Sequence, residues 1–285
     1  MTTRTVYAAA ALFLIVVSQP GCDPATDITT NQQNAESHSD ALRASTTIES
    51  AAVITYVSSY FASAADASMR DINTMQASTQ VVAQMQTRMK ADLADAKCIS
   101  VETDDKTYVV VHFDGCVGAH GALALTGTVT AMVAFEAKAC GDSSCPVAVL
   151  YSVNTTDLEI GDSSIVGDWT VRDPLAADQP YTWAGLLQVV TPERGVVFTS
   201  TATFTHADDC VDMSVDSTLA GAGQRALTCS GTDVHRCMGQ CPSAGSVSLT
   251  NQDDETMSWS YDGSVSTTVV APDSGNFSLG LTCSG

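Results

Sequence analysis

The chain is short of positive charge. Its 285 residues include 12 Lys and Arg against 32 Asp and Glu, which gives a formal net charge of −20 at pH 7. A surface potential of that sign repels phosphate backbones and anionic lipid headgroups, so we expect no nucleic-acid partner. The same charge favours solubility and opposes self-association.

The chain also lacks the motifs that commonly mark an enzyme. It has no Gly-x-Ser-x-Gly elbow, and two Gly-Asp-Ser-Ser segments, at 141–144 and 161–164, have no Asp-x-x-His partner late in the chain. The acidic clusters fit neither an EF-hand loop nor a glycine-rich calcium repeat. We therefore predict no catalytic residues, no metal ligands and no cofactor.

Long apolar runs are confined to the start of the chain. Arg4 is followed by an apolar run from Ala8 to Val17 and then by the segment Ser18-Gln19-Pro20-Gly21-Cys22. About ten apolar residues cannot span a bilayer core, which needs roughly 20 helical residues, so residues 1–21 are expected to be a cleaved export signal. With its Cys directly after a small residue, the segment resembles the precursors of bacterial lipoproteins.

This resemblance covers the signal segment only. It implies that Cys22 is diacylated and becomes the first mature residue, while cleavage after Ser18 by a secretory peptidase is the alternative. It also implies a place in the bacterial cell envelope, at the outer membrane, the cell surface or the periplasmic face of the inner membrane. The partners would be the membrane, through Cys22, and a protein at the cell surface or in the periplasm.

Ten cysteines in an exported chain predict a disulfide framework, because the compartment is oxidising. With Cys22 lipidated, nine remain for disulfide bonds: Cys98, Cys116, Cys140, Cys145, Cys210, Cys229, Cys237, Cys241 and Cys283. Cys98 and Cys116 flank a hairpin that turns near residues 104–105, so we expect them to pair. Cys140 and Cys145 can close a short ring. The last five make an odd set, so one unpaired thiol is expected among them.

One cluster in the second half carries ligand chemistry. Cys229, His235, Cys237 and Cys241 form a Cys-x5-His-x-Cys-x3-Cys pattern, and thiolates with imidazole hold zinc or copper. A redox pair of Cys237 and Cys241 beside Arg236 is a second possibility. Disulfide bonds are the expectation here, because the spacing matches no known zinc module and the chain is exported.

The chain divides into four parts. After the signal, residues 22–45 are polar without apolar periodicity and predict a disordered tether. Residues 46–97 predict a helical hairpin, because Thr46 with Glu49 and Ser68 with Asp71 fit capping boxes. The second helix carries an apolar stripe at three- and four-residue steps. Residues 98–285 predict an antiparallel β domain.

The β prediction is based on alternation. Leu125, Val129 and Val133 fall on one face of a strand, and threonines fall on the other. Connections short enough for hairpins, with no helical segments between strands, favour an antiparallel sheet, a sandwich or an open barrel. The fold class is therefore α+β and predominantly β, with an N-terminal helical hairpin and a large disulfide-stapled antiparallel domain.

We expect a non-enzymatic interaction or structural module. A carrier that holds a hydrophobic ligand in a cleft between helix and sheet is the first alternative, and space filled by side chains such as Met75, Met85, Leu125 and Phe135 would argue against it. A hydrolase or metal-dependent enzyme that uses His112, His120 or His206 is the second alternative. It requires His and Asp side chains that converge in a cleft.

Overall fold

The computed structural model describes residues 24–62, 80–85, 87, 97–103, 107–117, 124–140, 143–176, 179–192, 194–207, 210–220, 225–237, 240–271 and 275–281. Four residues for which the sequence makes a prediction lie outside these ranges: Cys22, Met75, His120 and Cys283. Within them, no helix is long and apolar enough to cross a membrane.

One long helix is followed by thirteen strands in the described part of the chain. The elements are α1 (Pro24–Phe61), β1 (Ile99–Thr103), β2 (Tyr108–Val117), β3 (Ala124–Cys140), β4 (Ser143–Ile160), β5 (Ser163–Pro174), β6 (Tyr181–Val190), β7 (Gly195–Ala207), β8 (Cys210–Leu219), β9 (Leu227–Cys237), β10 (Ala244–Thr250), β11 (Thr256–Ser260), β12 (Ser266–Val269) and β13 (Phe277–Gly280).

Eleven strands form a single sheet in which each strand pairs with its neighbour in sequence, from β1 to β11, and the pairings are antiparallel. The sheet curls but does not close, since β1 and β11 are its two edges. This architecture confirms the predicted class, α+β and predominantly β. Of the predicted forms, the open one is present: a curled sheet rather than a two-sheet sandwich.

Strict alternation along the strands gives the sheet one wet face and one buried face. In β7 the residues Val196, Phe198, Ala202 and Phe204 are buried, whereas the intervening threonines are exposed. Leu125, Val129 and Val133 are buried in the same way on β3. Because side chains alternate with period two, the strands place most of their apolar residues on the concave side of the curl.

Irregular positions let the longest strands bend. The β3–β4 register shifts between Thr126 and Val129, and the β4–β5 register shifts between Thr155 and Leu158. Gly127 lies at the first shift with φ of 113°, and a Cβ there would collide with the carbonyl oxygen of Asp157. Bulges of this kind increase local twist and curl a sheet.

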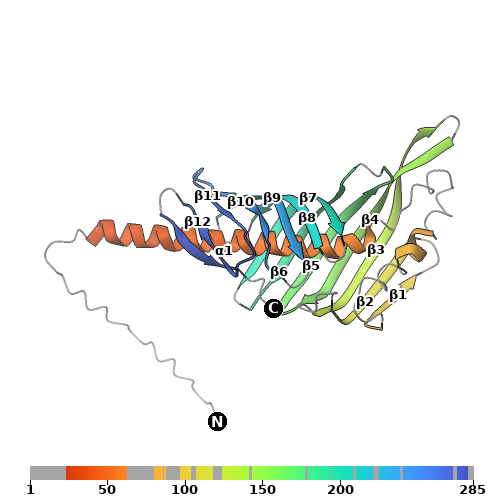
Figure 1. The fold of residues 1–285 in the computed structure, drawn as a ribbon, viewed down its shortest axis with the longest axis horizontal. Helices are drawn as coiled ribbons and strands as arrows, with labels where there is room; N and C mark the ends of the chain where they lie inside the picture. The colour runs from red at the N-terminus through yellow and green to blue at the C-terminus, as the bar shows by residue number, and fades with distance from the viewer. Residues whose placement is uncertain are drawn as a thin grey trace, which may run out of the picture.

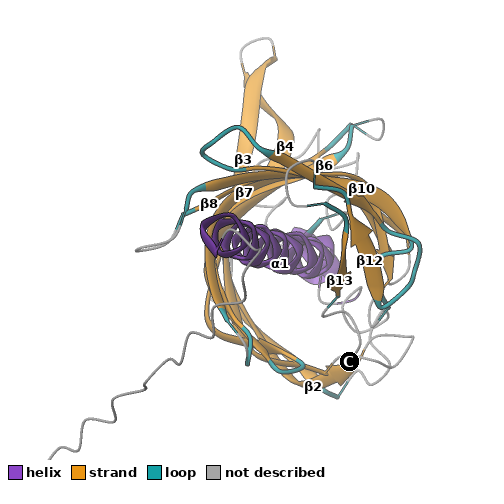
Figure 2. Ribbon diagram, turned by 90° about the vertical axis from the view of Figure 1, so that its left-hand side faces the viewer, coloured by secondary structure: helices purple, strands orange, loops and turns teal. Residues whose placement is uncertain are grey.

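Helix α1 runs inside the curl. Figure 2 shows it surrounded by the sheet, and Figure 1 shows that it follows the long axis of the molecule. Its residues are buried nearly without interruption from Asp40 to Ala62. The largest fully buried side chains come from both partners and include Tyr60 and Phe61 of α1 with Trp183, Phe198 and Phe204 of the sheet.

The disordered tether predicted for residues 22–45 is wrong from Pro24 onward, because α1 already begins there. The polar residues that suggested disorder are partly buried within the curl, as Asp40 and Arg43 show. From Asp40 onward the helix is enclosed by the sheet and needs no single apolar stripe, so this part of the sequence lacks the periodicity of a surface helix. The capping box at Thr46 is likewise wrong, since Thr46 lies in the middle of α1.

The second predicted helix falls mostly on residues that the structure does not describe. Residues 80–85 are helical, with Val81, Val82 and Met85 buried and Ala83 and Gln84 exposed. Val82 and Met85 belong to the predicted apolar stripe. Whether the two helices form a hairpin stays a prediction.

A small sheet of β12 and β13 lies beside the N-terminal half of α1 (Figure 2). It is joined to the large sheet by a bridge between Ser258 and Val270, and Phe277 stacks near His38 of α1 with ring centroids 5.3 Å apart. The small sheet thus covers part of the helix that the open side of the large sheet leaves bare.

Candidate functional site

Two cysteines, a carboxylate and an imidazole lie together on the outer face of the β8–β9 strand pair. The antiparallel register places Cys210 opposite Cys237 and Asp212 opposite His235. Residues two apart on a strand share a face, so the four side chains form two adjacent cross-strand pairs. All four are half-buried or exposed rather than part of the core.

A bulge decides which face these residues occupy. The β8–β9 register shifts between Met213 and Val215, and Asp233 opposite this region adopts a left-handed φ of 51°. Beyond the bulge, Val234 and Arg236 point inward and His235 points outward. A one-residue change in register would exchange the two sets, because the side-chain period of a strand is two.

The geometry joins a carboxylate, an imidazole and a disulfide in a row. Nδ1 of His235 lies 2.7 Å from Oδ1 of Asp212, and Nε2 of His235 lies 3.7 Å from Sγ of Cys237. Since a carboxylate can only accept a hydrogen bond, Nδ1 carries the proton and donates a hydrogen bond to Asp212. Nε2 then faces the sulfur of Cys237. Cys237 is bonded to Cys210. The His235 side chain is 36% exposed and that of Asp212 is 59% exposed.

This set differs from the four-residue pattern for which zinc or copper was an alternative to disulfide bonds. The ligand atoms of Cys210, His235 and Cys237 lie within 4.8 Å of one another, but Cys229 and Cys241 are not among them. Thiolates bind metals and disulfide sulfurs do not, so this trio can ligate only after reduction. The alternative of a redox pair formed by Cys237 and Cys241 does not apply, since Cys237 pairs with Cys210.

The disulfide framework is partly as predicted. The expected bond between Cys98 and Cys116 is present, and the second described bond joins Cys210 to Cys237. Cys145 and Cys241 are disulfide-bonded as well. The predicted ring of Cys140 with Cys145 lies outside the described side chains.

Cys229 is free, so its inclusion among the disulfide cysteines is wrong. It stands opposite Ser217 near the other end of the β8–β9 pair from Cys237 and faces the core. Burial is the main cause that raises the pKa of its thiol, to about 12. The expectation of an unpaired thiol among the last five cysteines is met by this residue.

Arg236 lies between His235 and Cys237 in sequence and points the opposite way, into the core. Its guanidinium donates to the carbonyl oxygen of Glu49 on α1 at 2.9 Å and to that of Gln240 at 3.2 Å. Burial lowers the pKa of Arg236, while the negative charge of Glu49 acts in the opposite direction. We call the cross-strand group Cys210, Asp212, His235 and Cys237 the outer site. The strand β9 that carries two of its residues is therefore fixed to the helix directly beneath it.

The described histidines named for an enzyme do not converge. His112 lies on β2, where Nδ1 is 3.2 Å from Oγ1 of Thr128 and Nε2 is 3.9 Å from a carboxylate oxygen of Glu102. His206 lies at the end of β7, with its ring 5.5 Å from that of Tyr181. Neither shares a site with His235, whose partnership with Asp212 lies on an open surface rather than in a cleft.

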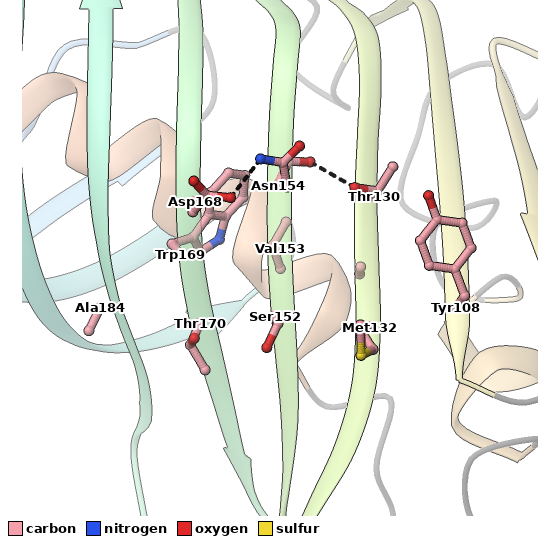
Figure 3. Close-up of a pocket in the computed structure, with 11 residues that line it drawn as sticks. Tyr108, Thr130, Met132, Ser152, Val153, Asn154, Asp168, Trp169, Thr170 and Ala184 are labelled. Carbon is pink, nitrogen blue, oxygen red and sulfur yellow. Dashed lines mark hydrogen bonds between the residues drawn. The ribbon is translucent and has the colours of Figure 1, made fainter.

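A shallow depression, separate from the outer site, crosses the outer face of β2 to β6. It has a volume of about 310 Å³ and is lined by Tyr108, Met132, Asn154 and Asp168 among others (Figure 3). The side-chain amide of Asn154 donates to the carboxylate of Asp168 at 2.6 Å, and the Thr130 hydroxyl donates to the backbone carbonyl oxygen of Asn154 at 3.4 Å. These contacts link Thr130, Asn154 and Asp168 to one another across three strands of the wall.

Side chains fill the contact between α1 and the strands beneath the outer site. The gap between Ala52, Val53 and Tyr56 of α1 and Val211 and Arg236 of the sheet is about 10 Å³, room for one water at most. Met85 and Leu125 are buried, and Phe135 packs against the same core. They are three of the side chains whose presence between helix and sheet was expected to argue against a carrier.

Comparison of the chain with protein-family models, with curated proteins and with solved structures finds no match. The sequence singles out His235 and Cys237, one half of the outer site, but it does not link them to Cys210 and Asp212, which the fold places opposite them. The signal that could have revealed it is a pair of matching triplets, Cys-Val-Asp at 210–212 and His-Arg-Cys at 235–237. When the two strands pair antiparallel, Cys210 lies opposite Cys237 and Asp212 lies opposite His235.

Proposed function

We propose that the protein is a lipid-anchored protein of the bacterial cell envelope, and that its β domain is a non-enzymatic interaction module. The anchor is Cys22, and the partner is a protein at the cell surface or in the periplasm. The main support is the continuity of the chain between the anchor and the core: α1 begins at Pro24, two residues after Cys22.

This continuity gives the anchor a firm connection to the domain. The N-terminal turns of α1 project beyond the strands (Figure 1), and near-continuous burial starts at Asp40. A helix rises about 1.5 Å per residue, so the stretch from Pro24 to Glu36 spans roughly 20 Å. A lipid on Cys22 would hold the β domain at about that distance from the membrane surface.

The module interpretation is supported by where the free surface lies. The concave face, where a sheet of this shape would hold a small ligand, is occupied along α1. The outer face remains for contact, and it carries two large apolar side chains, Met132 and Leu186, each 57% exposed.

The anchor is tested by metabolic labelling of the full chain with an alkyne analogue of palmitate in a bacterial host. We expect label and membrane partition in the wild type and in Cys229→Ala, and neither in Cys22→Ala. Cys229→Ala is the matched control, because it removes a cysteine that lies in the core. An unlabelled wild-type chain that begins at Gln19 contradicts the anchor.

The interaction part is tested separately with a photo-crosslinking residue in place of Met132 or Leu186 in living cells. A protein partner on the outer face gives adducts of discrete mass at one or both positions, and these adducts are lost when the same residue replaces the buried Val171. No adduct at either exposed position contradicts a partner on this face.

A further inference from the structure

We propose that the Cys210–Cys237 bond is a thiol–disulfide exchange site. An incoming thiol attacks Cys210, and Cys237 leaves as a thiolate that His235 stabilises. The inference goes beyond the interaction module and does not depend on the anchor. It is carried by the row Asp212, His235, Cys237, in which the imidazole bridges a carboxylate at 2.7 Å and a disulfide sulfur at 3.7 Å.

The step balances without any further reactant. The thiolate sulfur of the substrate forms a bond to Sγ of Cys210, and the bond between Cys210 and Cys237 breaks. The electron pair of that bond stays on Cys237 as a thiolate. The proton that the substrate thiol gives up goes, through solvent, to Nε2 of His235. The second thiol of a dithiol substrate then attacks the substrate sulfur of the mixed disulfide, so that the substrate's own disulfide forms and the bond to Cys210 breaks. The proton of that second thiol goes to the Cys210 sulfur. The substrate is oxidised by two electrons and the cysteine pair is reduced by two.

The position of His235 determines which sulfur leaves. Exchange is faster when the leaving thiolate is better stabilised, because its rate depends on the pKa of the leaving thiol. An imidazolium next to a sulfur stabilises its thiolate. His235 lies two residues from Cys237 on the same strand, with Nε2 facing that sulfur. Cys237 is therefore the leaving group and Cys210 the sulfur under attack.

Asp212 acts as a positioning residue. Its carboxylate accepts the Nδ1 proton, which fixes the tautomer and the orientation of the ring. With Nδ1 held in this way, Nε2 faces Cys237 and is the ring atom that can take up a proton. The cross-strand register supplies this pairing, since Asp212 and His235 face each other as the two cysteines do.

The site is also open to a thiol. The Cys210–Cys237 bond lies on the outer face of the hairpin, and neither cysteine is buried. The other described bond differs, because Cys116 is 1% exposed and its side chain belongs to the core. The same molecule therefore carries one candidate exchange bond and one structural bond, and the second reports on the integrity of the fold.

The test measures how fast each bond is reduced by glutathione in the folded protein, by quenching with a maleimide and mapping the labelled peptides. In the wild type we expect Cys210–Cys237 to open well before Cys98–Cys116, with the glutathione adduct on Cys210. An adduct on Cys237, or equal rates for the two bonds, overturns the proposal.

Three variants separate chemistry from packing. His235→Gln should slow the opening of Cys210–Cys237 by about tenfold and leave Cys98–Cys116 unchanged, because the leaving thiolate loses its partner. Asp212→Asn should slow it by about threefold, and Asp212→Glu should restore the rate. Asp216→Asn is the matched control, since Asp216 lies on the same outer row and contacts Ser230 instead.

The direction of the His235→Gln effect is decisive. If His235 only covered the disulfide, replacing it with Gln would leave the rate of Cys210–Cys237 opening unchanged or raise it. Either result overturns the proposal. Comparing glutathione with a reduced Cys-x-x-Cys oxidoreductase as donor identifies the source of the thiol. Faster reaction with the first indicates a small-molecule thiol, and faster reaction with the second indicates a protein dithiol.

Discussion

The indole Nε1 of Trp183 donates a hydrogen bond of 2.7 Å to the hydroxyl oxygen of Thr55, which joins β6 to α1 across the core. Trp169 on β5 makes the equivalent bond to Ser58 at 3.0 Å. Both indoles are almost fully buried, and an indole N–H can only donate. The polar residues of α1 are thus the acceptors that allow two tryptophans to lie inside the curl.

Thr55→Val tests this relationship. Valine keeps the branched shape but removes the acceptor, so the Trp183 N–H is left buried without a partner. We expect the free energy of unfolding to fall by about 1–3 kcal/mol, the cost of one unsatisfied buried donor. Urea denaturation followed by tryptophan fluorescence measures the change.

Thr47→Val is the matched control. Thr47 and Thr55 are both fully buried on α1, and each donates to the carbonyl four residues earlier, at 3.0 Å and 2.8 Å. Only Thr55 also accepts from an indole. Equal losses in the two variants would show that the Trp183 bond contributes nothing beyond the local one.

Arg236 and Glu49 give a second prediction, because they form the polar contact beneath the outer site. Arg236→Met removes the donor to the Glu49 carbonyl and leaves the buried Glu49 carboxylate without its nearby positive charge. We expect a loss of roughly 3 kcal/mol in the free energy of unfolding. The double variant Glu49→Gln with Arg236→Met should recover part of that loss, and a fully additive double-mutant cycle would contradict the coupling.

How far the sequence predicts this fold depends on which faces a segment contacts. From Cys98 onward each strand has one wet face and one buried face, so alternation at residues such as Val129 and Phe198 predicts strands and their orientation. The predicted Cys98–Cys116 bond is present, but the regular ladder ends with Ile99 opposite Phe113, so the two cysteines lie just beyond it rather than directly opposite each other.

The helix could not be predicted in the same way. α1 is enclosed by strands that lie far from it along the chain, so the residues near Asp40 and Arg43 in the sequence do not indicate that these two side chains are buried. The outer site was hidden for a related reason. Its residues share a face only because a bulge at Asp233 resets the alternation of β9, and the position of a bulge is not readable from the periodicity of one strand.

The hydroxyl of Tyr151 gives a third prediction. This side chain is fully buried against Phe61 of α1, and its oxygen has no hydrogen-bond partner among the described residues. Removing an unsatisfied polar group of this kind is nearly neutral or stabilising. We therefore expect Tyr151→Phe to keep or raise the thermal midpoint.

Tyr60→Phe serves as the comparison for Tyr151→Phe. Tyr60 is also buried, but its hydroxyl donates to that of Tyr56 at 2.8 Å. Its removal should cost about 0.5–1.5 kcal/mol. A larger loss in Tyr151→Phe than in Tyr60→Phe would mean that the Tyr151 hydroxyl makes a stabilising contact in solution.

The free thiol of Cys229 gives a pH dependence whose sign follows from its burial. Burial raises the pKa of this thiol from 9.0 to about 12. Between these values the unfolded chain loses the proton and the folded chain keeps it, so deprotonation favours unfolding. The stabilisation from the protonated thiol is complete below pH 9 and is lost as the pH rises toward 12.

Cys229→Ala isolates this contribution from those of the tyrosines that titrate in the same range. The difference in unfolding free energy between wild type and variant should be constant up to pH 9 and then shrink by roughly 1 kcal/mol per pH unit. Thiolate absorbance gives a direct check, with a midpoint near 12 in the folded protein and near 9 in urea. Rapid alkylation of Cys229 in the folded protein at pH 9 would contradict a thiol that stays protonated in the core.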